Sequence, residues 1–73
     1  MPRTAVESEV TGTVWKIAAA PGATLAADDT IVVVESMKME IPIVAPEGGR
    51  LVELRVQEGE AIESGQVVAV LER

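Results

Sequence analysis

The sequence repeats itself once, at an offset of 37 positions, and this repeat is the strongest constraint on its fold. Residues 12–35 align without a gap with residues 49–72, and large aliphatic residues coincide column by column. Two repeats are too few for a solenoid, which needs at least about three units to be stable. We therefore expect two similar halves packed face to face about a pseudo-twofold axis. The identical columns are Gly12/Gly49, Gly22/Gly59, Val33/Val70 and Glu35/Glu72.

Glycine, proline and aspartate divide both halves into segments of strand length. The core-forming residues are mostly Val, Ile and Leu, with a single aromatic residue, Trp15, which we expect to be partly buried. The alanine-rich segment 17–29 allows a helix as an alternative, because alanine is the best helix former. Pro21 and Gly22 interrupt that segment, and the equivalent segment 54–65 also contains a glycine. We interpret both as strand, tight turn and strand, so the predicted fold is an all-β sandwich or flattened barrel of about eight short strands.

One substitution within the repeat supports this interpretation. Asp28 stands where the second half has Gly65. A glycine in a turn indicates a residue with positive φ, and aspartate is among the few other residues that tolerate that conformation. Both positions are therefore expected to be left-handed.

The composition limits the possible functions. The chain has no cysteine and no histidine, which excludes disulfides, Cys/His metal sites and Cys–His or Ser–His nucleophiles, and we expect neither a catalytic site nor a metal site. A net charge of −6 argues against nucleic acid and anionic membranes as partners. No apolar stretch could cross a bilayer, and the N-terminus does not resemble a signal peptide. We expect a single domain, residues 1–73, in the cytoplasm.

The junction of the two halves holds an unusual lysine. Lys38 lies between Met37 and Met39, and an apolar strand is expected on each side. The simplest hairpin places Met37-Lys38 at the centre of a two-residue turn, although such turns favour Asn-Gly or Asp-Gly. Departures from local turn chemistry are most common at functional sites. The alternative is a solvated lysine beside core-filling methionines, and the pattern alone does not decide between the two interpretations.

These residues resemble the biotinyl domain family. The segment E-S-M-K-M-E at 35–40 is similar to the family's biotin-attachment motif, and A-P-E-G-G at 45–49 and E-G-E-A-I-E-S-G-Q at 58–66 follow its usual pattern. The resemblance covers residues 6–73. It implies a barrel-sandwich hybrid of two four-stranded antiparallel sheets with quasi-twofold symmetry. The gap-free repeat leaves no room for the extra "thumb" loop of some members, so a thumbless domain is expected.

The resemblance also implies a site. Lys38 would be the residue that carries covalent biotin, and Met37 and Met39 would be read by biotin protein ligase and by carboxylase active sites. Ser36 stands where the family commonly has alanine, and the segment 23–30 departs from the usual turn pattern. The residues expected to take part in ligase or partner recognition are Glu35, Ser36, Met37, Met39 and Glu40.

The implied function is that of a biotin carboxyl carrier, without catalytic activity of its own and monomeric in isolation. It would carry a carboxyl group from a biotin carboxylase to a carboxyltransferase acting on an acyl-CoA of the acetyl- or propionyl-CoA type, as in fatty acid metabolism. The chain would be a free-standing carrier or an excised C-terminal domain. Two alternatives remain: a lipoyl carrier of the same fold, disfavoured by Met37 and Met39, and an unmodified interaction module.

Overall fold

A computed structural model describes residues 2–73, which form eight β-strands and no helix. No part of residues 2–73 forms a helix able to span a membrane. The β-branched and aliphatic runs form the strands, and the Gly, Pro and Asp positions separate them. The strands are β1 (Arg3–Glu7), β2 (Gly12–Ile17), β3 (Thr24–Leu25), β4 (Thr30–Ser36), β5 (Met39–Val44), β6 (Gly49–Leu54), β7 (Ala61–Ile62) and β8 (Val67–Glu72).

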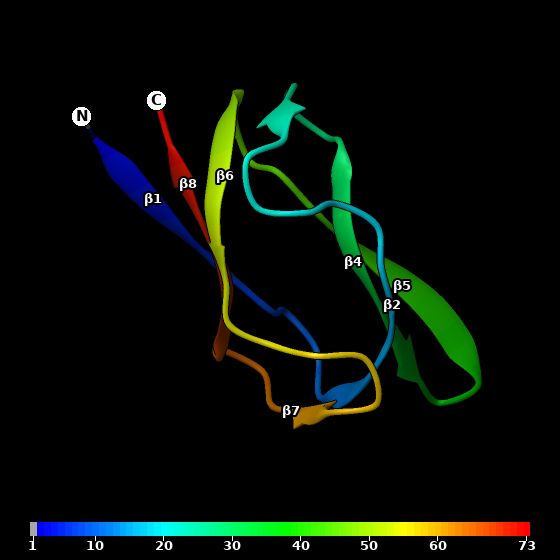
Figure 1. Ribbon diagram of the computed structural model, residues 1–73. Coiled ribbons are helices and arrows are strands. Elements are labelled where there is room, and N and C mark those ends of the chain that lie inside the picture. Colours follow the sequence, from blue (N-terminus) through cyan, green and yellow to red (C-terminus); the bar gives the residue numbers. More distant parts are fainter. Residues whose placement is uncertain (1) are drawn as a thin grey trace.

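The strands form two four-stranded antiparallel sheets, as predicted (Figure 1). Sheet 1 has the order β1-β8-β6-β3, and sheet 2 has the order β5-β4-β2-β7. A shift of 37 residues converts each strand of sheet 1 into the strand at the same place in sheet 2: β8 into β4, β6 into β2, β3 into β7 and β1 into β5. The sequence repeat is therefore the quasi-twofold symmetry of the fold.

The halves do not pack as separate layers, which differs from the expected face-to-face arrangement. Each sheet takes two strands from the first half of the chain and two from the second. The reason is that the hairpin between the halves pairs β4 with β5, and the first and last strands, β1 and β8, pair with each other. The two halves are consequently interleaved, and neither has a complete sheet of its own.

Irregularities in the ladders obey the same symmetry. The register of β2 against β4 shifts at Trp15, and that of β6 against β8 shifts at the equivalent Val52. A second pair of shifts falls at Ile31 and Val68. Bulges increase the local twist and bend a strand, which lets two short sheets curl around a common core.

The core is aliphatic, as the composition predicts, and fills the space between the two sheets. Ile31, Leu51 and Leu71 are completely buried, and Trp15 is not part of the core. Inward-facing residues of both sheets contribute because alternate side chains of a strand point to the same face. The buried hydrophobic cluster consists of Val6, Val14, Leu25, Ile31, Val32, Val34, Ile43, Ala45, Leu51, Val56, Ile62, Val68, Ala69 and Leu71.

The predicted left-handed positions are confirmed. Asp28 has φ 73° and Gly65 has φ 89°. Their amides donate equivalent hydrogen bonds, from Asp28 to the Ala45 carbonyl at 2.8 Å and from Gly65 to the Ser8 carbonyl at 2.7 Å. The first bond ties the turn between β3 and β4 to the connection between β5 and β6. The second ties the turn between β7 and β8 to the connection between β1 and β2.

The alanine-rich segment is not helical. After β2 the chain passes through residues 18–23, turns at Pro21-Gly22 and enters β3. The equivalent connection, residues 55–60, has the same length and turns at Gly59. Equal lengths leave no inserted loop in either half, so the barrel is thumbless, as predicted.

Candidate functional site

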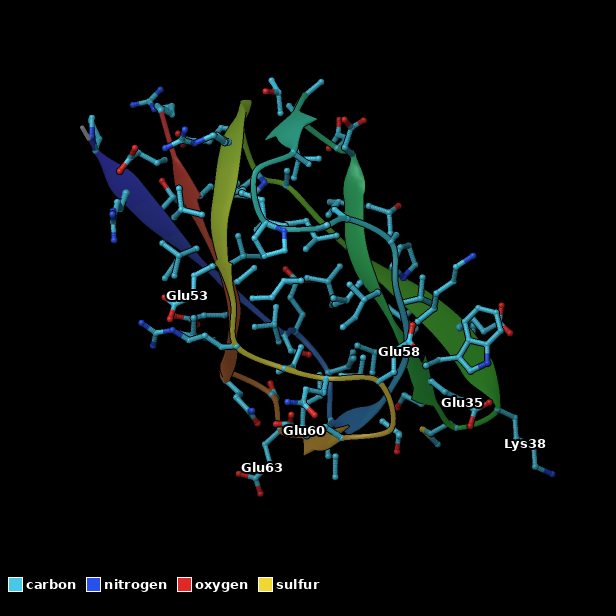
Figure 2. All side chains as sticks on the ribbon, viewed as in Figure 1. Glu35, Lys38, Glu53, Glu58, Glu60 and Glu63 are labelled. Carbon is cyan, nitrogen blue, oxygen red and sulfur yellow. The ribbon has the colours of Figure 1, made fainter. Side chains whose placement is uncertain are left out.

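Lys38 lies at the tip of the β4–β5 hairpin, at the end of the molecule opposite both termini (Figure 1). Its side chain is exposed and extends away from the barrel (Figure 2). The hairpin position predicted from the sequence is therefore correct. The molecule measures 36 Å along its longest axis, and the hairpin and the two chain ends lie at opposite ends of the molecule.

The turn itself has an unusual conformation for its residues. Met37 has φ 52° and Lys38 has φ 65°, so both central residues are left-handed, as a type I′ hairpin turn requires. Left-handed backbone costs a residue with a Cβ on the order of 1–2 kcal/mol. The β4–β5 ladder, paired from Ser36/Met39 down to Thr30/Val44, holds the turn in place. Lys38 is thus presented on a defined backbone, not on a flexible loop.

Two contacts fix the base of the hairpin to the neighbouring strand. The Ser36 hydroxyl donates a hydrogen bond to the Thr11 carbonyl at 2.8 Å. Gly12 lies against the backbone of Glu35, where any side chain would collide with the Glu35 carbonyl oxygen. The sequence marked Gly12 as part of the repeat but did not reveal this contact, because it joins strands that are far apart in the chain.

Both methionines of the motif are displayed to solvent. Met37 is 93% exposed and Met39 is 64% exposed. Neither belongs to the core cluster, so the alternative of core-filling methionines is wrong. Exposed apolar side chains on both sides of a lysine are typical of a surface that a protein partner reads.

The other candidate residues surround this tip. Glu35 and Glu40 lie directly opposite each other on β4 and β5, and both are exposed. Trp15 is half-exposed, at 50%, on the neighbouring strand β2. Glu58 was expected only to flank a turn, but its carboxylate accepts a hydrogen bond from the Ile17 amide at 3.1 Å at the end of β2. Sequence spacing gives no signal for that contact.

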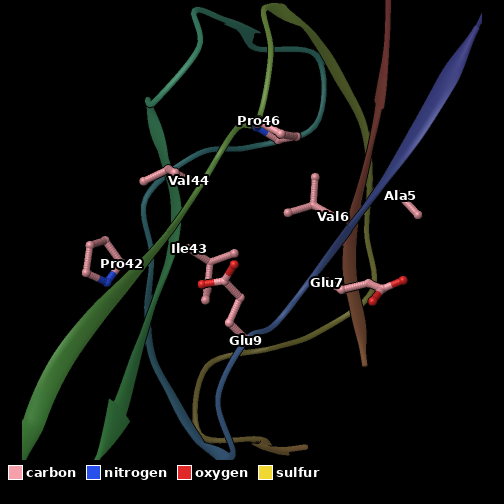
Figure 3. Close-up of a pocket in the computed structure, with 8 residues that line it drawn as sticks. All are labelled: Ala5, Val6, Glu7, Glu9, Pro42, Ile43, Val44 and Pro46. Carbon is pink, nitrogen blue, oxygen red and sulfur yellow. The ribbon is translucent and has the colours of Figure 1, made fainter. Parts of the chain in front are cut away.

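A pocket of about 380 Å³ lies elsewhere, between the edge strands β1 and β5 (Figure 3). Its lining residues are related by the 37-residue offset, so the pocket lies on the quasi-twofold axis. Lys38 does not line it, and the acidic residues of the described chain form no cluster suited to a metal ion. The lining residues are Ala5, Val6, Glu7 and Glu9, with their equivalents Pro42, Ile43, Val44 and Pro46.

A symmetric β-barrel that displays a lysine on a rigid hairpin has the form of a carrier domain, a protein that holds a cofactor instead of enclosing a substrate. The sequence family is that described as "Biotin-requiring enzyme", the biotin/lipoyl domain family, whose profile matches residues 1–71. The chain belongs to this family. The two four-stranded sheets confirm the predicted fold, and this membership confirms the predicted cofactor, biotin. The chain is a biotin carrier domain of the type found in biotin-dependent carboxylases.

Individual relatives agree with this assignment. The chain is 45% identical over 65 residues to the biotin-dependent acyl-coenzyme A carboxylase alpha3 subunit of Mycobacterium leprae, matching 89% of this chain and 11% of that protein. It is 33% identical over 66 residues to the biotinylated protein TB7.3 homolog of Mycobacterium leprae, which covers 90% of this chain and 93% of that protein. The chain is therefore similar both to a small part of a large carboxylase subunit and to nearly all of a small protein.

Among solved structures, the urea carboxylase of Kluyveromyces lactis contains a closely similar domain. The two superpose with a TM-score of 0.94 at 32% sequence identity, over 99% of this chain and 6% of the carboxylase. The similarity supports the barrel described above.

Proposed function

We propose that this chain is a biotin carboxyl carrier in which Lys38 bears the covalent biotin and residues 1–73 act as one carrier domain. The observation that supports the proposal best is the exposed lysine on a rigid type I′ tip, in a member of a biotin-requiring family. Of the two lysines in the chain, Lys38 is the one at the hairpin tip, and Lys16 lies within β2.

The attachment step needs little from the carrier except geometry. The Lys38 ammonium loses a proton, its nitrogen attacks the activated acyl carbon of biotin, an amide bond forms, and the activating group leaves. Biotin protein ligase would supply the activated acyl group and the proton acceptor. The carrier supplies a side chain that projects away from the barrel, so the ligase can enclose it without unfolding the hairpin.

Biotin on this lysine would let the carrier take up a carboxyl group at a biotin carboxylase site and release it at a carboxyltransferase site. The carrier's own residues would present the arm to each site in turn and dock only briefly, because tethering already provides a high local concentration. Met37 and Met39 would contact both active sites as exposed, adaptable apolar side chains.

We propose an acyl-CoA as the final acceptor, and hence a role in fatty acid metabolism in the cytoplasm. The support is the 45% identity to an acyl-coenzyme A carboxylase subunit. Urea is the second candidate acceptor, supported by the similarity to the urea carboxylase domain. The biotinylated chain can be added to an acyl-CoA carboxylase system with acetyl-CoA or propionyl-CoA, and to a urea carboxylase system with urea. The acceptor that becomes carboxylated distinguishes the two candidates. The carrier is expected to remain a monomer in isolation.

The sequence left two alternatives open, a lipoyl carrier and an unmodified module of the same fold. Met37 and Met39 favour biotin, because lipoyl carriers typically have an aspartate before the modified lysine and a small residue after it.

Intact-mass analysis after expression with biotin protein ligase tests the proposal. We expect the mass to rise by one biotinyl group, with peptide mapping to Lys38. Lys38→Arg is expected to abolish the modification, while Lys16→Arg, the matched control, leaves it complete. An unmodified wild-type chain beside a biotinylated reference carrier would overturn the proposal, as would biotin on Lys16. A lipoyl group added by a lipoate ligase in place of biotin would support the lipoyl alternative.

A further inference from the structure

The edge strand β1 has unpaired backbone groups along one side. In an antiparallel pair, hydrogen-bonded and non-hydrogen-bonded residue pairs alternate along the two strands. The Arg73 amide donates to the Pro2 carbonyl at 3.1 Å, and the Ser8 amide donates to the Gln66 carbonyl at 2.9 Å, which fixes this alternation at both ends of β1. Three residues of β1 consequently point their amides and carbonyls away from β8, to the free edge. They are Arg3, Ala5 and Glu7.

The repeat provides a second edge strand, β5, for comparison. A shift of 37 residues places Pro42 at the position of Ala5 and Ala45 at that of Ser8. The Ala45 amide donates to the Asp29 carbonyl at 2.8 Å, which is the equivalent of the bond from Ser8. Pro42 therefore occupies an outward-facing position, where its ring replaces the amide that a further strand would need. Proline on an edge strand prevents further pairing, so β5 is blocked at its centre and β1 is not.

The β1 edge borders an open space. β1 is the outermost strand of sheet 1, and within residues 2–73 it pairs only with β8. The pocket of about 380 Å³ lies between β1 and β5, and Ala5, Val6 and Glu7 line it on the β1 side (Figure 3). An incoming strand would lie only about 4.8 Å from β1 in the hydrogen-bonding direction. The edge of β1 is therefore open to another strand.

The charges of β1 are complementary to a second copy of the same strand. If two copies pair antiparallel about Ala5, Arg3 of each copy lies opposite Glu7 of the other. Arg3 contacts Glu72 through its Nε at 3.1 Å, and 63% of its side chain is exposed, so its terminal nitrogens are available. Within residues 2–73, Glu7 takes part in no ion pair. Opposite charges directly across two strands stabilise their pairing.

We propose that the chain associates with a second copy of itself through antiparallel pairing of the two β1 edges. The outward amides and carbonyls of Arg3, Ala5 and Glu7 in one copy exchange hydrogen bonds with those of Glu7, Ala5 and Arg3 in the other. The two copies of the four-stranded sheet 1 thereby join into one continuous sheet. The same surface of each copy forms the contact, so the association closes at a dimer and does not continue into a fibre.

This dimer is weak. β1 has only five residues, whereas stable interfaces bury ~1,200–2,000 Å². The net charge of −6 on each copy also opposes association. The monomer expected in isolation is therefore the form in dilute solution, and the dimer forms at high concentration. The paired strands are antiparallel, so the two Lys38 tips point in opposite directions, and the proposed attachment of biotin does not depend on the dimer.

Sedimentation equilibrium of the purified chain from about 0.01 mM to about 1 mM tests the dimer. We expect the weight-average mass to rise with concentration from 7.7 kDa toward twice that value. Ala5→Pro installs the residue that the fold accepts at the equivalent position of β5, and it should raise the dissociation constant at least about 10-fold. Ala5→Ser, the matched control, keeps the amide and should leave the dissociation constant within about twofold of wild type. A wild-type mass of one chain at about 1 mM would overturn the proposal, as would undiminished association of a folded Ala5→Pro variant.

Two charge variants test the register of the pairing. Arg3→Glu and Glu7→Arg each place like charges opposite each other and should weaken association about 10-fold. An equimolar mixture of the two variants restores opposite charges at both contacts and should associate about as tightly as the wild-type chain.

The control for these variants is Glu63→Arg, which makes the same change in charge as Glu7→Arg at an exposed site outside β1. Both changes lower the net negative charge of the chain, so only a specific contact explains weaker association of Glu7→Arg alone. Thermal melts verify that each variant is folded. A mixture that associates no more tightly than either charge variant by itself would overturn the proposed pairing. Biotin on Lys38 is expected whichever result is found, so the proposed function is tested separately.

Discussion

The α-carbon of Gly12 lies so close to the backbone of Glu35 that a methyl group on Gly12 would stand 2.4 Å from the Glu35 carbonyl oxygen. The equivalent pair, Gly49 and Glu72, repeats the contact at 3.0 Å. Glycine at the start of β2 therefore allows the end of β4 to approach closely. This contact holds the strand that leads directly into the Met37-Lys38 turn.

Alanine substitutions at these glycines should destabilise the domain in the order of their clashes. We expect Gly12→Ala to lower the free energy of unfolding by ~2–3 kcal/mol, because the backbone of β4 must move, and Gly49→Ala by ~1 kcal/mol. Gly48→Ala is the control, since its Cβ would meet only an ordinary contact at 3.5 Å. Urea denaturation measures the series. Equal effects of Gly12→Ala and Gly48→Ala would contradict the close approach.

The left-handed turn at the tip predicts that one substitution can raise the stability of the domain and slow its biotinylation. Met37→Asn places a residue that tolerates positive φ at the first central position, and we expect it to stabilise the domain by ~0.5–1 kcal/mol. The same change removes an exposed apolar side chain, so biotinylation should slow. The urea midpoint and the initial rate of biotinylation measure the two effects. A lower midpoint would show that Met37 is not strained.

Glu72 lies between Arg3 and Arg50 across three strands of sheet 1, and its equivalent in sheet 2, Glu35, lies opposite Glu40. These two cross-strand rows predict opposite responses to the same chemical change. Glu72→Gln removes a carboxylate held by two arginines, and we expect a loss of ~0.5–1 kcal/mol at low salt that shrinks as salt rises. Glu35→Gln removes one of two opposed carboxylates and should be neutral or slightly stabilising under the same conditions. Thermal melts at two salt concentrations compare the pair. Equal destabilisation by both variants would show that the rows do not differ in charge compensation.

The left-handed turn at Asp28 provides a test of the symmetry. Asp28→Gly reproduces the residue of the second half and should stabilise the domain slightly or leave it unchanged, because φ 73° suits glycine. Asp28→Val should destabilise it by ~1–2 kcal/mol, because a β-branched residue is an outlier at that φ. Urea denaturation distinguishes the two. A well-tolerated valine would mean that the turn relaxes to another conformation.

The sequence by itself determined the features that depend on local chemistry and on the repeat. The 37-residue offset predicted two equivalent sets of strands, the Asp28/Gly65 pair predicted a left-handed turn, and the equal spacing predicted a barrel without a thumb. These features could be deduced because φ preferences and strand length act over a few residues. The resemblance of residues 35–40 to the attachment motif added the candidate site.

Only the tertiary structure decided how the strands combine. The halves interleave between the sheets, Gly12 closes against Glu35, and Glu58 caps β2, all through contacts between segments far apart in the chain. The two glutamates of the repeat, Glu35 and Glu72, are identical in sequence, yet one faces a carboxylate and the other two arginines. The two-residue turn already places Glu40 opposite Glu35, whereas Arg3 and Arg50 reach Glu72 only because strands far apart in the chain pair with each other.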